Sequence, residues 1–291
     1  MASIRNSKNW AFLLCFVVFY GGVCRASLIA HYNFGLSSPS TANLGSAGTA
    51  ADGVLVNNAT IVDIDTTARG VEYALQLNNT TGSGLADSSY MNITNGDDSW
   101  YDSAIPATSG ARSYAMWVQL LPTTTQSWSI AMSKGYETAL CLGTGTPQGN
   151  SWEEAVFSYH TGVASWSPLK GTVKQSSDTY WYHMVATFDG VDYKTGSLYI
   201  NGVLQESRQV WGPLYANDLD LLIGAEPNRT GYQFGWNGMI DDIRIYDEHI
   251  DATGAYDLFV NTYEQARILI PEPATIFLLG LGSLAIIGRK R

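Results

Sequence analysis

The residue of this sequence best placed for chemistry is Asp241, in the segment Met239–Tyr246. Strict alternation along a strand puts Asp241 on the same face as Ile243 and Ile245. Its neighbour Asp242 then takes the opposite face. A carboxylate that points inward must be paired, hydrogen-bonded or bound to a cation, because burying an unpaired charge is costly. Two interpretations stay open: backbone N–H groups or a nearby arginine satisfy Asp241, or it holds a structural Ca²⁺ together with loop carbonyls.

Asp189, in the sequence Phe-Asp-Gly, is the second candidate for a calcium ligand. Asp-Gly is also ordinary turn chemistry, so a purely local role stays open beside the metal. Asp218 and Asp220 form an acidic pair two residues apart, a spacing typical of a solvated strand edge. No EF-hand-type run of ligands occurs in the sequence.

Catalytic patterns are absent from the sequence. Glycoside hydrolysis needs two carboxylates that flank the scissile bond. Glu153 and Glu154 are adjacent, so in a strand they would point to opposite faces and could not act as a pair. There is no His-Glu-x-x-His zinc pattern, no Gly-x-Ser-x-Gly elbow and no phosphate-cradling loop. We therefore expect a non-catalytic protein, with glycosidase activity as the less favoured alternative.

Aromatic residues in the expected loops and strand ends are candidates for ligand contacts, because exposed rings can stack on the faces of sugars. These residues are Trp100, Tyr101, Trp128, Trp152, Trp166, Trp211, Tyr215, Tyr232 and Trp236. From them we select Trp152, Trp211, Tyr232 and Trp236 as ligand-binding candidates. The alternative is that such rings cap the core of the domain, as aromatic side chains usually do.

The charge of the chain argues against nucleic-acid binding. The 291 residues include 16 basic and 26 acidic side chains. Without the two terminal segments described below, 10 basic and 25 acidic residues remain, a net charge of about −15. Such a surface repels phosphate backbones. The intervening residues 27–270 suit one large all-β domain or two small ones.

Short runs of aromatic and β-branched residues, separated by small and polar clusters, predict a sandwich or barrel. The expected strands are 27–34, 71–77, 89–93, 111–121, 130–133, 138–142, 155–159, 180–188, 197–200, 203–205, 221–224 and 236–246. Asn201-Gly202 between two of them predicts a type I′ hairpin. Residues 35–53 are expected to form a long loop, and only Asp251–Ala266 has helical spacing.

Several of these blocks together resemble the LamG-like (laminin G, concanavalin A-like) jelly rolls. The most telling are WYHMVATFDG from Trp181 with LYING from Leu198, and GMIDDIRIY from Gly238, after SYAMWV from Ser113. The resemblance implies a domain over residues 27–268, made of two antiparallel sheets packed face to face, with a short helix after the last strand. LamG-like domains often bind calcium, which favours the metal at Asp241. Some concanavalin A-like folds are glycoside hydrolases, but their clustered Glu-x-Asp-x-Glu signature is absent here.

The first 26 residues are expected to be a secretory signal peptide. Arg5 and Lys8 precede an apolar stretch from Trp10 to Val23, and the small residue Ala26 suits cleavage before Ser27. An uncleaved anchor would need a longer apolar run. The sequence therefore predicts export and a helical signal segment.

Residues 271–291 form the second terminal segment. Three parts follow one another: Pro271, Glu272 and Pro273; an uncharged apolar run over 274–288; and Arg289, Lys290 and Arg291. We expect the apolar run to be a transmembrane helix whose three cations stay on the cytoplasmic side. It is short, at about 22 Å against the ~30 Å of a bilayer core, so a buried terminal helix is the alternative.

The order of these parts resembles the PEP-CTERM sorting signal of Gram-negative bacteria. The resemblance implies a transient anchor in the inner membrane that an exosortase, a membrane protease, recognises and cuts near the motif. The passenger then reaches the cell surface or extracellular matrix. We therefore expect an exported protein whose LamG-like domain binds carbohydrate or another surface ligand. A purely structural matrix or adhesion component is the alternative.

Overall fold

The structure is a computed structural model that describes residues 27–35, 39–64, 73–79, 85–106, 110–121, 128–135, 138–144, 153–161, 165–166, 169–172, 181–190, 195–209, 214, 216–227 and 235–266. The two terminal segments predicted from the sequence, 1–26 and 271–291, lie outside these residues. Within the described residues, no helix is both long enough and apolar enough to cross a bilayer.

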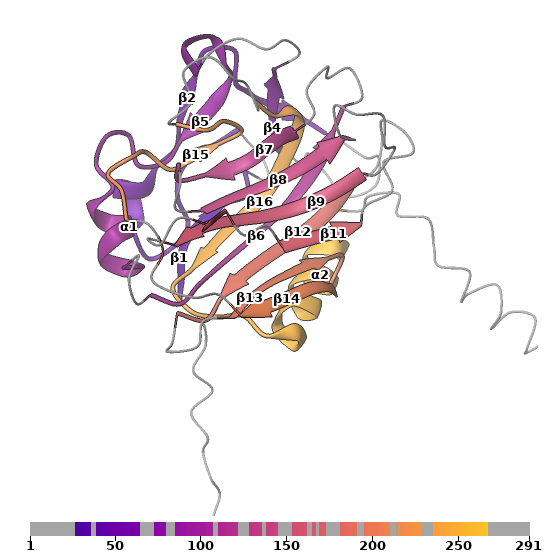
Figure 1. The fold of residues 1–291 in the computed structure, drawn as a ribbon. Coiled ribbons are helices and arrows are strands. Elements are labelled where there is room, and N and C mark those ends of the chain that lie inside the picture. Colours follow the sequence, from indigo (N-terminus) through magenta and orange to yellow (C-terminus); the bar gives the residue numbers. More distant parts are fainter. Residues whose placement is uncertain are drawn as a thin grey trace, which may run out of the picture.

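Two antiparallel sheets make up the described part of the chain, as predicted (Figure 1). The first contains β1 (Leu28–Tyr32), β3 (Thr60–Asp63), β4 (Tyr73–Asn78), β6 (Arg112–Leu120), β12 (Trp181–Phe188), β13 (Thr195–Ile200), β14 (Val203–Gln209) and β16 (Asn237–Tyr246). The second contains β2 (Val54–Val56), β5 (Tyr90–Asn92), β7 (Trp128–Ser133), β8 (Thr138–Thr144), β9 (Glu153–Thr161), β10 (Ser165–Trp166), β11 (Leu169–Thr172) and β15 (Leu222–Ile223).

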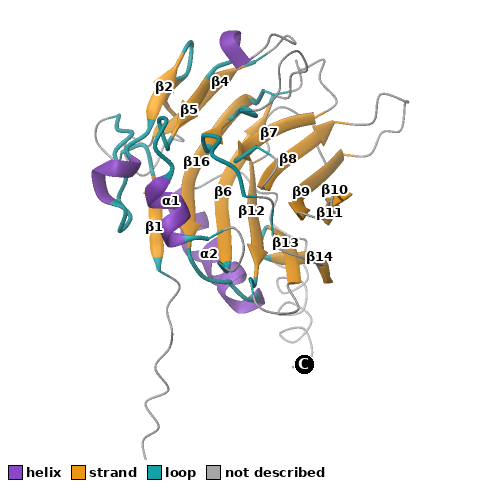
Figure 2. Ribbon diagram, turned by 60° about the vertical axis from the view of Figure 1, so that its left-hand side comes forward, coloured by secondary structure: helices purple, strands orange, loops and turns teal. Residues whose placement is uncertain are grey.

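The order of the strands defines two opposite edges of the sandwich. The first sheet runs β14-β13-β12-β6-β16-β4-β3, with β1 added beside β16, and the second runs β10-β9-β8-β7-β15-β5-β2, with β11 beside β9. Because β11 contacts β14, these strands lie at one edge and β2 lies toward the other. Figure 2 separates the two layers and shows β2 and β14 far apart.

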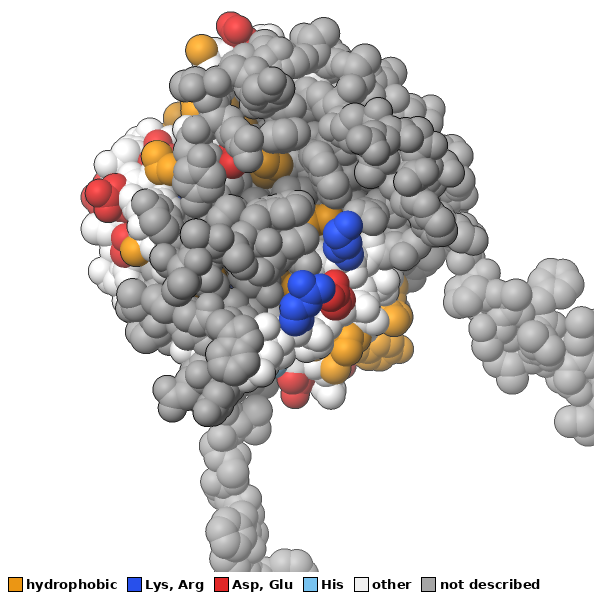
Figure 3. Space-filling model, in the orientation of Figure 1, with side chains coloured by type: hydrophobic (Ala, Val, Ile, Leu, Met, Phe, Trp, Pro, Cys, Tyr) orange, Lys and Arg blue, Asp and Glu red, His pale blue; other side chains and the backbone are white. Residues whose placement is uncertain are grey.

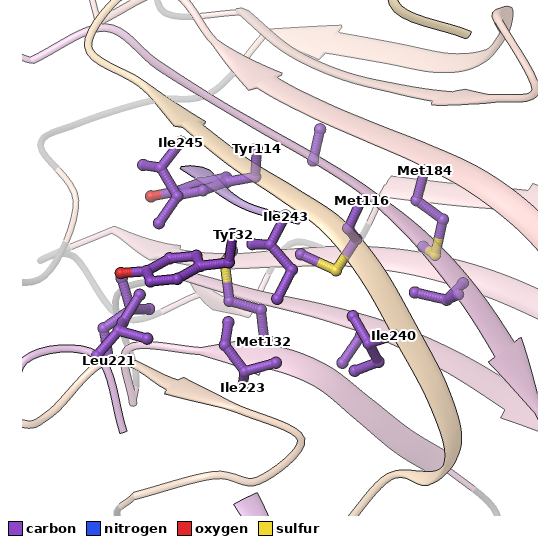
Figure 4. Close-up of a cluster of buried hydrophobic side chains, with 14 of the residues drawn as sticks. Tyr32, Tyr114, Met116, Met132, Met184, Leu221, Ile223, Ile240, Ile243 and Ile245 are labelled. Atoms are coloured by element: carbon purple, nitrogen blue, oxygen red, sulfur yellow. The ribbon is translucent and has the colours of Figure 1, made fainter. Parts of the chain in front are cut away.

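The hydrophobic core fills the space between the sheets. Side chains from β1, β6, β12 and β16 meet those from β7 and β15 (Figure 4). On β6, Tyr114, Met116, Val118 and Leu120 point into this core. The intervening Ala115 and Trp117 are equally buried on the outer face. The prediction that this strand is covered on both sides is confirmed.

The outer cover of the first sheet is helix α2 (Ala252–Ala266). Its Ala255 packs with Val185 and Tyr199 of the sheet, and its Phe259 packs near Trp117. The short helix after the last strand is therefore confirmed. A second helix, α1 (Ser99–Ala104), and two 3₁₀ turns, η1 (Gly48–Ala51) and η2 (Leu85–Asp87), were not predicted.

The hairpin between β13 and β14 turns at Asn201 and Gly202, whose φ angles are 50° and 75°. Two successive positive φ angles are the mark of a type I′ turn, so this prediction is also confirmed. The strands β2, β3, β10 and β11 were not predicted. They are two to four residues long, which leaves too little alternation to recognise.

Gly238 is the glycine whose replacement should damage the fold most clearly. Its φ is 151°, and a Cβ added there would lie 2.0 Å from the backbone oxygen of Gln119 on β6. We expect Gly238→Ala to lower the free energy of unfolding by about 2–4 kcal/mol, because β16 must move away from β6.

Gly48→Ala is the matched control, since its φ is 60° but nothing lies within 4 Å of the added Cβ. It should cost only about 1 kcal/mol, the penalty of left-handed backbone. Urea unfolding of both variants measures the difference. Equal losses would contradict the close approach of β6 and β16.

Candidate functional site

Strand β16 changes partner halfway along one of its edges. Its first part, from Asn237 to Ile240, pairs with β4, and its second part, from Ile243 to Tyr246, pairs with β1. On the other edge it pairs with β6 throughout, with a register shift between Asp241 and Arg244. At this shift β16 has one residue more than β6, which forms a β-bulge centred on Asp242. The φ of Asp242 is 46°.

The bulge moves Asp241 away from the face that strict alternation predicts. Ile240 and Ile243 both point into the core, although they are three residues apart. Asp241 stands opposite Trp117 of β6, and directly opposed residues share a face. Its side chain therefore lies on the outer face beneath α2, and the prediction that it shares the face of Ile243 and Ile245 is wrong. It is 4% exposed, and its Oδ1 accepts the Asp242 N–H at 2.7 Å.

Asp242 links β16 to β1 through its own carboxylate. Its Oδ1 accepts from His31 Nε2 at 2.7 Å and from Arg244 Nε at 2.9 Å. Burial opposes the charge, yet these hydrogen bonds and the Arg244 guanidinium hold the pKa of Asp242 below its usual value. Oδ2 of the same carboxylate is buried without a hydrogen-bond partner. The result is a charged cluster, nearly closed to solvent, at the junction of the two strand partners.

Aromatic rings continue this buried layer toward β12. The Trp117 ring lies 5.0 Å from the His183 ring and 5.8 Å from that of Phe259, and its Nε1 donates to Thr262 Oγ1 of α2 at 2.8 Å. His183 is 1% exposed, and its Nδ1 has no hydrogen-bond partner. Burial therefore lowers the pKa of His183 to about 3, so this imidazole is neutral at physiological pH.

The two predicted calcium ligands do not come together. Asp241 of β16 stands opposite Trp117 of β6, and Trp117 stands opposite His183 of β12. Asp189 follows β12, six residues beyond His183. At about 3.3 Å per residue this puts Asp189 about 20 Å along the sheet from Asp241. Asp189 Oδ1 accepts the Thr195 N–H at 2.9 Å, as expected for a turn. No group of three or more His, Cys, Asp and Glu side chains among the described residues could hold a metal ion. Calcium stays a prediction from the sequence.

The predicted ligand-binding aromatics have different outcomes. Trp236 is fully buried in the core between the sheets, so its ring cannot stack on a sugar and this prediction is corrected. Trp152, Trp211 and Tyr232 lie outside the described residues. The same is true of the sorting residues Pro271, Glu272, Pro273, Arg289, Lys290 and Arg291.

A second polar site, which the sequence did not predict, forms where three loops meet at one end of the second sheet. One loop follows β5, the second follows β7 and the third precedes β15. They meet because β15 pairs with both β5 and β7. We call the side chains that join them the loop-end cluster. It comprises Asn92, Thr94, Asp98, Lys134, Asn217 and Asp220.

Lys134 is the centre of the loop-end cluster. Its side chain is fully buried, and its ammonium donates to Asp98 Oδ2 at 2.7 Å and to the carbonyls of Leu219 and Asn217 at 2.9 and 3.1 Å. It also lies 5.5 Å from the centre of the Tyr101 ring of α1. One carboxylate and two carbonyls around a cation resemble the oxygen shell of a metal, but here the cation is an amino group of the chain itself.

Asp220 holds the loop after β5 in place. Its carboxylate accepts from Thr94 Oγ1 and the Gly96 N–H, both at 2.7 Å, and from Asn92 Nδ2 at 2.9 Å. Burial works against the charge, but these three donors hold the pKa of Asp220 below its usual value. The interpretation of Asp220 as part of a solvated edge was therefore wrong, whereas Asp218 is exposed as expected.

The surface of this end is polar and open to solvent. Asn95, Asp97 and Asp218 are exposed on loops that Lys134 and Asp220 hold in place. Trp100 of α1 is half-buried beside them and packs edge-on against Tyr101, with the ring centroids 5.8 Å apart. Fixed amide and carboxylate groups of this kind can bond sugar hydroxyls. The buried acids under α2 are not accessible in this way.

The family profile described as the concanavalin A-like lectin/glucanases superfamily matches residues 86–253, more than half of the chain. The chain belongs to this superfamily. Residues 269–291 match the PEP-CTERM protein-sorting motif, which marks proteins exported to the cell surface. Both resemblances seen in the sequence are therefore confirmed. No curated protein matches the chain.

Solved structures show the same lectin-type fold. Domain 4 of AbnA, a GH43 extracellular arabinanase from Geobacillus stearothermophilus, in complex with arabinotriose, is similar over 80% of this chain and 98% of that domain, with 21% identity and a TM-score of 0.50. The binding domains of botulinum neurotoxin serotype D and of Paraclostridial Mosquitocidal Protein 1 are similar over 81% of this chain, each with 14% identity and a TM-score of 0.54. The match spans only 52% of the length of each of these two binding domains.

The neutral, buried His183 predicts a specific loss of stability in acid. Its folded pKa of about 3 lies below the usual value of 6.5 for histidine, so the unfolded chain binds the proton more tightly. The stabilisation is complete above pH 6.5 and falls as the pH drops toward 3, by up to about 5 kcal/mol. Replacing His183 by Gln should flatten the pH dependence of unfolding over this range, as measured in urea at several pH values. His249→Gln, at an exposed position, should leave the dependence unchanged. Parallel curves for the wild type and His183→Gln would contradict the burial.

Lys134 gives a second prediction. Lys134→Met fills the same space but leaves Asp98 and the Asn217 and Leu219 carbonyls without their donor. We expect a loss of about 2–3 kcal/mol in the free energy of unfolding, because a partly buried carboxylate and two carbonyls lose their donor. Lys170→Met removes an exposed lysine and should change stability by no more than about 0.5 kcal/mol. Similar small effects for both variants in urea unfolding would show that the loop-end cluster does not depend on the ammonium.

Proposed function

We propose that this protein is an exported, non-catalytic surface or matrix protein whose lectin-type domain binds carbohydrate. One observation carries the proposal: the loop-end cluster fixes a polar surface that stays open to solvent at one end of the sandwich. Asn95, Asp97 and Asp218 provide hydrogen-bonding groups there. The fold supports this, because the similar arabinanase domain was solved with arabinotriose.

The absence of catalysis belongs to the same proposal. Asp241 and Asp242 are adjacent and buried. Their positions do not suit hydrolysis of a polysaccharide, which needs two carboxylates on either side of an accessible bond.

The route to the surface completes the proposal. Residues 1–26 direct export and are removed, and the apolar run 274–288 holds the chain in the inner membrane for a time. An exosortase-type protease then cuts near Pro271–Pro273. The match of 269–291 to the sorting motif supports this route. A purely structural role in the matrix is the second candidate, and the sorting motif favours it equally.

Carbohydrate binding can be tested on the purified full chain in detergent, first with arabino-oligosaccharides and then with an array of bacterial polysaccharides. Asp218→Ala and Trp211→Ala should each weaken binding about tenfold, the loss of one hydrogen bond or one stacking contact of about 1.4 kcal/mol. Asp257→Ala and Tyr256→Ala remove an exposed acid and an exposed ring from α2 and serve as matched controls.

Two results would contradict carbohydrate binding at the loop-end cluster. One is an array that stays blank with and without calcium, which would leave the structural role as the function. The other is equal weakening by the control variants, which would move the binding site away from the loop-end cluster.

A further inference from the structure

Exposed apolar side chains gather on one part of the described surface. Val203 and Leu204 at the start of β14 are 60% and 48% exposed, and Tyr256 and Val260 of α2 are 55% and 38% exposed. We call these four residues the α2 patch. The other large exposed hydrophobic residues among those described are Leu44 and Val54. Val54 lies in β2, toward the opposite edge of the sandwich from β14.

The two halves of the α2 patch are neighbours in space. The turn between β13 and β14 packs directly on α2, because a Cβ added at Gly202 would lie 3.2 Å from Tyr256 Cα and 3.3 Å from Phe259 Cβ. Figure 3 shows apolar side chains gathered at the lower right of the molecule, where Figure 1 places β14 and α2. Leu204 stands opposite Tyr199, which packs with Ala255 of α2, so it shares the α2 side of the sheet, and Val203 lies at the edge of the patch beside the turn.

Two of the few basic side chains of this acidic protein lie beside the patch. Arg208 is on β14 and forms an ion pair with Glu206. The backbone N–H of Lys170, whose side chain is exposed on β11, donates to the same carboxylate at 2.7 Å. Figure 3 shows basic side chains near the apolar group, with an acidic side chain beside them. Glu206 and the exposed Asp257 of α2 offset these cations, so the apolar side chains themselves are what suits a bilayer surface.

The distance from the patch to the sorting segment is short. Helix α2 ends at Ala266, and the apolar run starts at Ala274, so seven residues connect them. Fully extended, these residues span at most about 25 Å. Tyr256 and Val260 lie about 15 and 9 Å from the end of α2 along the helix, at about 1.5 Å per residue. Residues 268–270 of the connection are Ile, Leu and Ile, which favour an interface over water.

From these observations we propose that the α2 patch docks the lectin-type domain onto the lipid surface while residues 274–288 are in the membrane. The proposal rests on the transient anchoring proposed above. Docking orients the sandwich, with α2 and the start of β14 against the bilayer. It also keeps the connection to the sorting motif near the membrane.

The experiment uses the full chain in vesicles of phosphatidylethanolamine and phosphatidylglycerol, in a background with Cys15, Cys24 and Cys141 all replaced by Ala. Single cysteines at Val203, Tyr256 or Val54 carry an environment-sensitive fluorophore. Nitroxide-labelled lipids, with the nitroxide near the headgroup, should remove at least about half of the fluorescence at positions 203 and 256, within the 5–10 Å depth of interfacial side chains. The Val54 label should keep its fluorescence. Leu204→Glu should restore fluorescence at position 256, and thermal unfolding checks that the variant is folded.

The outcomes separate this proposal from the one on which it rests. Resistance of the chain to carbonate extraction without quenching at positions 203 and 256 would refute docking and leave the anchor in place. Extraction by carbonate would refute the anchor and docking with it. A third outcome is that both labels are shielded from an aqueous quencher but not quenched by the nitroxide, and that the shielding increases with protein density. It would show that a second copy covers the patch and would also refute docking on lipid.

Discussion

The exchange of partners along β16 is the constraint on which the rest of the described structure depends. This strand of ten residues pairs with β6 along one edge, while β4 and then β1 share the other edge. Such an exchange needs an irregularity, and the bulge at Asp242 provides it. The Asp242 carboxylate then binds His31 of β1 and Arg244 of β16, which holds the incoming strand in register. A charged contact thus closes the sheet at the point where the backbone ladder is interrupted.

Much of the fold could be predicted because alternation and turn chemistry are local signals. β6 and β12 have long aromatic and β-branched runs, and Asn201-Gly202 specifies its own turn. The position of Asp241 could not be predicted in the same way, because one inserted residue reverses the faces of everything before it. No glycine marks the bulge. Aspartate tolerates positive φ, so the sequence reads as an uninterrupted strand.

The loop-end cluster could not be predicted because its members are distant in sequence. Asp220 and Thr94 are 126 residues apart, and Lys134 reaches carbonyls 83 and 85 residues away. From the sequence alone, short polar loops of this kind are expected to be solvated. Their mutual hydrogen bonds form only when the fold brings the strands together. The six-residue helix α1 could not be predicted for the same reason, because it depends on a distant contact: its Tyr101 ring packs beneath the Lys134 ammonium.

The two surfaces of interest lie on different sides of the sandwich. Figure 1 places α1, beside the loop-end cluster, away from α2 and β14. On the α2 side Asp241 and Asp242 are buried, and Arg244 pairs with Asp242, while Asp257 is exposed on the helix. Carboxylates at the other end, such as Asp97 and Asp218, stay exposed. A bilayer that holds the chain by residues 274–288 would attract the apolar patch and repel the acidic loops. Docking through the α2 patch therefore turns the proposed sugar-binding end toward the medium, where polysaccharide is found.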